Sequence, residues 1–149
     1  MIVLFVLVIS LLLYRAIGAL GVAALATWPG ATRYALATML LFTASAHFTK
    51  MRHDLVRMVP DSIPQPMTLI YFTGVCEIAG AIGLLLPSTR QAAAIALIVF
   101  FIVVFPANVK AARTGVAVGG KRATPLWLRS SMQVLFIALT WWSALSHPS

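Results

Sequence analysis

The sequence predicts an all-α membrane protein, a bundle of five transmembrane helices. Of its 149 residues, 61% are hydrophobic and only 9% are charged, so too few charges remain to cover a surface exposed to water. Five apolar runs are long enough to cross a hydrocarbon core of about 30 Å as helices. Because lipid cannot satisfy the amides of an open strand, helix is the expected state of each run. We expect a single transmembrane domain over residues 1–149.

The first two runs cover 2–26 and 33–50. The first run ends in small residues like a signal peptide, but it lacks a basic start, its apolar stretch is too long and Arg15 interrupts it. We therefore expect a retained helix. Proline and glycine at 28–30 predict a turn between the two runs. The second run is short in its apolar part, and Lys50 can extend it by reaching up to the membrane surface.

The other three runs cover 67–86, 89–109 and 125–145. Pro87 stops the third run, and Thr89 offers a hydroxyl cap to the fourth. Thr124 and Pro125 are typical of the N-cap and the first residue of the fifth helix. The intervening 51–66 segment mixes apolar and basic side chains, which predicts an amphipathic cytoplasmic loop lying on the inner leaflet. A lid over a pocket is the alternative interpretation of this loop.

The basic residues predict the orientation in the membrane. Eight Lys and Arg side chains fall in the loops 49–66 and 110–124 or, as Arg129, just inside the last run, whereas the other side holds only Arg33 and Arg90. This positive-inside bias predicts a cytoplasmic N-terminus and an external C-terminus. The formal net charge of +8 makes the anionic lipids of the inner leaflet the expected partner. Since no nucleic-acid-binding motif accompanies the charge, we expect no nucleic acid partner.

The composition excludes a soluble globular enzyme, a disordered chain and a disulfide scaffold. Cys76 is the only cysteine, so neither an intrachain disulfide nor a Cys-x-x-Cys redox pair can form. A metal site is not expected, because no ligand spacing pairs His53 or His147 with His47. The lack of a second intramembrane histidine also disfavours a haem, and no flavin motif is present.

Glu77, near the middle of the third run, is the first catalytic candidate. An ionisable residue in a membrane helix costs at least about 2.5–3.5 kcal/mol unless it is paired. Thr73 lies one turn before Glu77 and Gly80 one turn after it, so this small and polar face predicts that Glu77 points into the bundle. Arg15 is the candidate ion-pair partner. The alternative is a buried, hydrogen-bonded carboxyl group that only fixes the register of the helices.

His47, near the inner end of the second run, is the second catalytic candidate, and Thr43 lies one turn before it. An imidazole at this place can donate to a quinone or enol oxygen, or simply bond a neighbouring helix. In the fourth run, Pro106 predicts a kink that frees the carbonyl of Ile102. Asn108 can then satisfy either exposed backbone or a ligand.

Arg129 and Gln133 share one face of the fifth run. Polar residues therefore converge from four different helices, and this predicts one buried small-molecule pocket in the cytoplasmic half of the bundle. The predicted site residues are Thr43, His47, Thr73, Glu77, Asn108, Arg129 and Gln133.

Five stretches carry a family resemblance: AHF at 46–48, DLVRMVP at 54–60, GVCEIAGAIGLLLP at 74–87, FPANV at 105–109 and TPLWLR at 124–129. As a set, over about 33–142, they resemble the DoxX-like family of small bacterial membrane proteins. The resemblance implies a four-helix core in the bacterial inner membrane, to which the 2–26 helix is an addition. Family members are described as the membrane part of a thiosulfate:quinone oxidoreductase and as partners of redox-defence proteins.

Three functions remain open on these grounds. The first is a quinone-linked oxidoreductase subunit, in which His47 and Arg129 bind a quinone oxygen, Glu77 handles protons, and a soluble or membrane redox subunit carries the electrons. The second is a non-enzymatic lipid-binding, scaffold or chaperone-like protein, and a homo-oligomer is compatible with either. The third is an intramembrane isomerase that uses Glu77 and His47 as acid and base.

Overall fold

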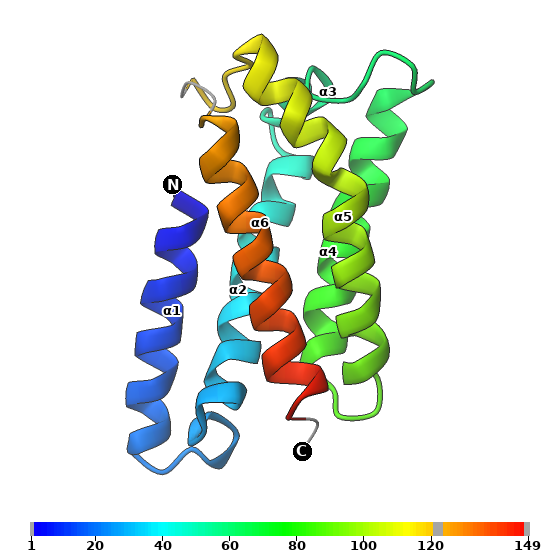
Figure 1. Cartoon of the computed structure of the whole chain (residues 1–149). Coiled ribbons are helices and arrows are strands. Elements are labelled where there is room, and N and C mark those ends of the chain that lie inside the picture. The colour runs from blue at the N-terminus through cyan, green and yellow to red at the C-terminus, as the bar shows by residue number, and fades with distance from the viewer. Residues whose placement is uncertain (1, 121–123, 148–149) are drawn as a thin grey trace.

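The computed structural model describes residues 2–120 and 124–147, and within these ranges the chain is all-helical, without a strand. The helices are α1 (Ile2–Ala19), η1 (Ala23–Leu25), α2 (Trp28–Phe48), α3 (Arg52–Val56), α4 (Pro66–Leu85), α5 (Arg90–Thr114), α6 (Leu126–Thr140) and the π-helix η2 (Trp141–Leu145). The five long helices alternate in direction along one axis, and α3 lies across one end of the bundle (Figure 1). The predicted all-α class is confirmed.

Three helices, α1, α4 and α5, are long and apolar enough to cross a membrane. Their outward faces carry large apolar side chains such as Phe5, Phe72 and Val103, each more than half exposed. So large an apolar surface suits lipid and not water. These helices therefore identify a membrane protein. The helices α2 and α6 are not among these three. The helix α6 has only 15 residues, whereas α2 has 21 residues but is less apolar.

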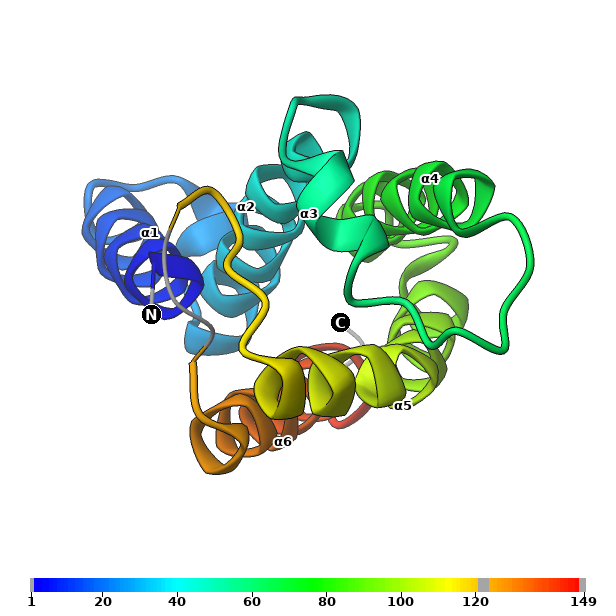
Figure 2. The same cartoon turned by 90° about the horizontal axis from the view of Figure 1, so that it is seen from above.

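The helix α2 is the interior helix of the bundle. It lies between α1 and α4, with which it makes its most extensive contacts, and Figure 2 shows it flanked by both. Eleven of its 21 residues are buried, and Ala35 and Leu36 are fully so. Neighbouring helices shield α2 from lipid, so it can hold polar side chains that an outer helix would expose to hydrocarbon. This explains why its hydropathy is low although it is embedded in the bundle.

The connection between α1 and α2 differs from the prediction. The helix α1 ends at Ala19, well before residue 26, and the chain turns at Gly21 with a positive φ of 108°. The predicted turn at 28–30 is wrong, because these residues form the first turn of α2. Thr27 is the N-cap, and its Oγ1 accepts a hydrogen bond of 3.1 Å from the amide of Gly30. Proline at the second residue of a helix needs no amide partner, so it begins the helix instead of breaking it.

The side chain of Arg15 holds this connection in place. Its Nη1 donates to the carbonyls of Leu25 (3.1 Å) and Ala26 (2.9 Å), and its guanidinium lies 4.9 Å from the centre of the Trp28 ring. Within the described residues no ion pair joins Arg15 to Glu77, so the predicted partnership is wrong. The carbonyls at the end of η1 are nearer to Arg15 and take its hydrogen bonds.

Three further helix ends depart from expectation. The hydroxyl of Thr89 donates a hydrogen bond of 3.1 Å to the carbonyl of Gly83, in the last turn of α4. It therefore satisfies the C-terminal end of α4 and makes no capping hydrogen bond to α5. The helix α5 continues through Pro106 to Thr114, beyond the predicted end at 109. The N-cap of α6 is Pro125 and not Thr124. The carbonyl of Thr124 accepts a hydrogen bond from the side chain of Arg129. Lys121 and Arg122, two of the basic residues counted in the 110–124 loop, lie outside the described residues.

The segment between α2 and α4 is fastened to the end of the bundle. Met58 and Val59 are buried, and Lys110 Nζ donates to the carbonyl of Val59 (2.7 Å) and to Asp61 (2.6 Å). The carboxylate of Asp54 accepts from the amide of Gly119 (3.0 Å). These contacts hold the segment across the ends of α5 and α4, so it is more than a solvated linker.

The glycine at position 18 allows the α1–α2 connection to fold back on α1. A methyl group there would overlap the carbonyl of Leu25, which is backbone and cannot move aside easily. We expect Gly18→Ala to lower the free energy of unfolding in detergent by about 1–3 kcal/mol. Ala16→Ser, an exposed position on the same helix, is the control and should change stability little. Equal stability of the two variants would contradict this role for Gly18.

Candidate functional site

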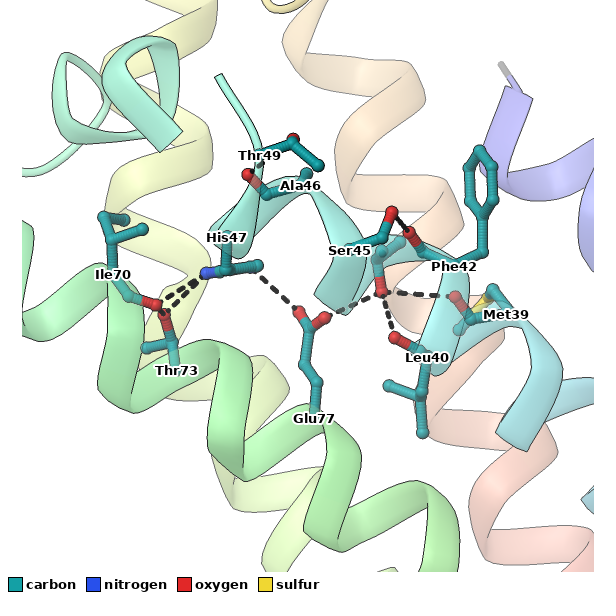
Figure 3. Close-up of polar contacts among 11 residues, drawn as sticks. Met39, Leu40, Phe42, Ser45, Ala46, His47, Thr49, Ile70, Thr73 and Glu77 are labelled. Carbon is teal, nitrogen blue, oxygen red and sulfur yellow. Dashed lines mark hydrogen bonds and ion pairs between the residues drawn. The ribbon is translucent and has the colours of Figure 1, made fainter. Parts of the chain in front are cut away.

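Glu77 lies inside the bundle, on the face of α4 that packs against α2. Only 9% of the residue is exposed. Its Oε2 accepts a hydrogen bond of 2.8 Å from Thr43 Oγ1. Its Oε1 lies 3.6 Å from His47 Nε2, on the side where Figure 3 shows His47 facing Glu77. Both oxygens of the carboxyl group therefore face side chains of α2, and one of them accepts a hydrogen bond. The two predicted catalytic residues are direct neighbours.

The hydrogen bonds of His47 define which nitrogen faces the acid. Its Nδ1 lies 2.7 Å from the carbonyl of Ile70, and a carbonyl can only accept, so Nδ1 carries a hydrogen. Thr73 Oγ1 lies 3.2 Å from the same nitrogen and donates to Ile70 at 2.9 Å. The other nitrogen, Nε2, is thereby turned toward Glu77, as Figure 3 shows.

This arrangement places two groups that can each carry a proton side by side, His47 Nε2 and the Glu77 carboxyl group. At 3.6 Å the two groups are closer than the limit for an ion pair but farther apart than hydrogen-bonded atoms. An oxygen of a ligand could accept the proton from either partner, which is the chemistry required of a general acid and base.

Gly74 is a residue of this site that the sequence analysis did not single out. A Cβ atom at Gly74 would lie 2.6 Å from His47 Cβ and 3.0 Å from the Phe48 ring. Its hydrogen therefore allows α4 to approach α2 closely enough for Glu77 to meet His47. The sequence does offer a sign of this role. Gly74 follows Thr73 on a helix rich in small residues, and small residues allow a neighbouring helix to approach closely.

The remaining predicted residues form a second polar group, between α5 and α6. Arg129 Nη1 donates to Asn108 Oδ1 (2.9 Å), and Asn108 Nδ2 donates to Gln133 Oε1 (3.1 Å). Gln133 in turn donates to the carbonyl of Phe101, five residues before Pro106. The carbonyl that Pro106 leaves without its helical donor is that of Ile102, the next residue. This chain of hydrogen bonds therefore joins α6 to α5 beside the proline.

The structure separates the seven predicted residues into two groups. Thr43, His47, Thr73 and Glu77 join α2 to α4, whereas the other three join α5 to α6. Within the described part of the chain, no hydrogen bond or ion pair links the two groups. A cavity of about 380 Å³ lies at the start of α4 and another of about 360 Å³ at the opposite end of the bundle, and Glu77 lines neither. The predicted single pocket is not supported by these contacts.

Metal binding finds no support in the described ranges. No group of three or more His, Cys, Asp and Glu side chains there could hold a metal ion. His147 lies near the C-terminal end of the fold, with Nδ1 3.0 Å from the carbonyl of Trp142.

Residues 36–144 match the family model described as Domain of unknown function (DUF8561), and this chain belongs to that family. The match covers about three quarters of the chain, from α2 to η2, so it includes both polar groups and leaves α1 outside. The comparison with curated proteins and the comparison with solved structures each gave no match.

The hydrogen bond from Thr43 stabilises the buried carboxyl group. We expect Thr43→Val, which keeps the shape but removes the donor, to lower the free energy of unfolding by about 1–3 kcal/mol. Ser45→Ala is the matched control, because it removes a hydroxyl from an exposed position on the same helix. Denaturant unfolding in detergent measures both, and a loss no larger for Thr43→Val would refute the assigned contact.

Proposed function

We propose that this protein is a membrane subunit of a quinone-linked oxidoreductase, and that the His47–Glu77 pair exchanges protons with the quinone. The observation that carries the proposal is the burial of two titratable side chains, side by side, in a bundle whose outer helices α1, α4 and α5 are apolar. Such groups are costly in a membrane and are usually retained for function. A membrane-soluble ligand that gains and loses protons suits this pair.

The proposal treats all five long helices as membrane spans. The helix α6 continues without a break into η2, so 126–145 is 20 helical residues, or about 30 Å of helix, enough for a hydrocarbon core. Exposed Trp127 and Trp141 lie near its two ends, where aromatic residues meet the membrane surface. The 21 residues of α2 suffice in length, and its neighbours supply its apolar surroundings.

The chemistry needs two protons and two electrons for each quinone reduced to quinol. The His47–Glu77 pair would deliver one proton to a quinone oxygen, recover a proton from the cytoplasmic side and deliver that one in turn, so that each quinone receives two. The electrons must come from a redox subunit that binds this protein, because this chain carries one cysteine and no cysteine pair. Thr43 and Thr73 would keep the carboxyl group and the imidazole in position as the proton moves.

The resemblance of 33–142 to DoxX-like proteins supports this proposal and its location in a bacterial inner membrane. The stretch that matches the family model, 36–144, is nearly the same as the proposed four-helix core. In this orientation α3 and the basic Lys50 and Lys110 face the cytoplasm and its anionic lipids. Asn108, Arg129 and Gln133 would contact the same quinone only if it reached from α2 to α6.

A scaffold without catalysis is the second candidate. The observation that favours it is that the carboxyl group and the imidazole each have partners in the absence of any ligand, and that these partners join α2 and α4. In this interpretation the pair only fixes the packing of two helices. A substitution of Glu77 or His47 would then lower the stability of the fold without changing the binding of a ligand. Measuring both quantities therefore separates the two functions.

Quinone binding tests the proposal directly. We expect a short-chain quinone to raise the unfolding temperature of the purified full chain in lipid nanodiscs, and Glu77→Gln and His47→Phe to weaken the affinity about tenfold or more. Arg57→Gln, an exposed cation on the loop after α3, is the control and should bind like the wild type. Arg129→Gln reports whether the ligand also reaches the second polar group.

If the folded Glu77→Gln chain binds quinone like the wild type, or if the wild type shows no binding, the pair has no role in quinone chemistry. A large loss of unfolding temperature in Glu77→Gln with no quinone binding by the wild type would favour the scaffold.

Cysteine labelling tests the five spans and their orientation. In a Cys76→Ser background, Asp61→Cys and Ser88→Cys place single thiols in the loops before and after α4. We expect a membrane-impermeant maleimide added to intact cells to label position 88 and not position 61, because the spans put these loops on opposite sides. Labelling of both positions, or of position 61 alone, would refute the orientation.

A further inference from the structure

A cation lies beside exposed aromatic rings where α3 meets the ends of α2 and α4. The helix α3 packs against both longer helices, as Figure 2 shows from above. The guanidinium of Arg52 lies 6.0 Å from the centre of the Tyr71 ring, and the centre of the Phe48 ring lies 6.0 Å from that of Tyr71. Phe48 is 43% exposed and Tyr71 38%. Aromatic rings and a cation at the end of a membrane helix are typical of the boundary between head groups and hydrocarbon.

The positive charge of Arg52 has no acidic partner in the part of the chain that the structure describes. The sequence holds three acidic residues, and each is engaged elsewhere. Asp54 and Asp61 bond to the α5–α6 connection and to α5, and Glu77 is buried inside the bundle. Among the described residues the guanidinium of Arg52 makes no hydrogen bond, so the Tyr71 ring orients it while its donors stay available.

An apolar face of α4 continues from this cation into the depth of the membrane. Val75 lies one turn after Tyr71 and Ile82 two turns further, so the three residues share one face of the helix. Val75 and Ile82 are both more than half exposed. From Tyr71 to Ile82 the helix rises about 16 Å, close to the hydrocarbon depth of one leaflet, about 15 Å. An acyl chain along this face would therefore place its head group beside Arg52.

We propose that an anionic phospholipid binds on this surface, with its phosphate at Arg52 and an acyl chain along α4 from Tyr71 to Ile82. The planar fork of a guanidinium can donate two parallel hydrogen bonds to phosphate oxygens. Lys50, exposed two residues before Arg52, adds a second cation. Two cations favour a head group of net negative charge over a zwitterionic one, whose own cation they repel.

The apolar face decides between a lipid and a protein as the occupant. An acidic protein segment would contact the cations at the membrane surface, but it would not reach Val75 and Ile82 at the depth of the hydrocarbon. A phospholipid accounts for both parts of the surface, because its head group is anionic and its chains are apolar.

Native mass spectrometry of the full chain tests the proposal. The protein is released from nanodiscs that contain phosphatidylcholine and phosphatidylglycerol in equal amounts and with the same acyl chains. We expect the wild type to retain phosphatidylglycerol over phosphatidylcholine about tenfold or more. Added glycerol phosphate, which carries the phosphate but no acyl chain, should not displace the lipid. Equal retention of the two lipids, or displacement by glycerol phosphate, would overturn the proposal.

Substitutions then locate the site. Arg52→Gln should lower the retention of phosphatidylglycerol about tenfold, and Tyr71→Leu, which removes the ring that orients Arg52, should lower it by a smaller factor. Arg113→Gln is the matched control, because it removes the same charge from an exposed position in the last turn of α5, at the same end of the bundle as α3 (Figure 1). It should change the retention little.

Equal losses in Arg52→Gln and Arg113→Gln would indicate a general attraction to surface charge and would contradict the assigned site. If Arg52→Gln does not fold, Tyr71→Leu must still lower the retention more than Arg113→Gln does. The test does not involve quinone, so its outcome is independent of the proposed function.

Discussion

The close approach of α2 and α4 at Gly74 is the constraint on which the rest of the structure depends. With only a hydrogen at this position, the ring of His47 can lie against α4 and bond the carbonyl of Ile70. That bond turns the other ring nitrogen toward Glu77. A larger residue would push the two helices apart, and an acid in the middle of an apolar helix would lose its nearest titratable partner. The close packing of the two helix backbones, more than the attraction between the two side chains, therefore positions the site.

The bundle keeps its polar groups on the inside by making one helix interior. The helix α2 carries Thr32, Arg33 and His47, all of them buried, although each would be costly on a face exposed to lipid. The outer helices α1, α4 and α5 present apolar side chains instead. As a result the molecule has different polar chemistry at different depths. An imidazole lies beside a carboxyl group inside the bundle, and two guanidinium groups lie at one end.

Much of the fold could be predicted from the sequence because a hydrophobic run long enough to cross a membrane has few alternatives to helix. A long helix lies in each predicted run, with the largest departures at the end of α1 and the start of α2. The small and polar stripe around Glu77 correctly indicated an inward-facing side chain. Local spacing carried this information. It did not identify Gly74 as a contact of His47, because the role of that glycine depends on which helix lies opposite.

The errors arose where a side chain had a choice of partners. Arg15 bonds the carbonyls that end η1, which lie near it only because α1 stops at Ala19 and the chain folds back. Thr89 bonds backward to α4 instead of forward to α5. The single predicted pocket became two polar groups, because the order of neighbours around the bundle sets Glu77 against α2 and Gln133 against α5. A sequence does not contain that order in any local pattern.

The helix α1 lies outside the stretch that matches the family model, yet it covers one flank of α2. The hydroxyl of Tyr14 meets that of Thr38 at 2.8 Å, and its ring lies 5.8 Å from the ring of Tyr34. In a relative that begins at α2, the same flank would face acyl chains, and a hydroxyl there would have no companion. In each family member, the residues at the positions of Tyr34 and Thr38 should therefore depend on whether a helix precedes α2. We expect polar residues there when such a helix covers them and aliphatic residues when it does not.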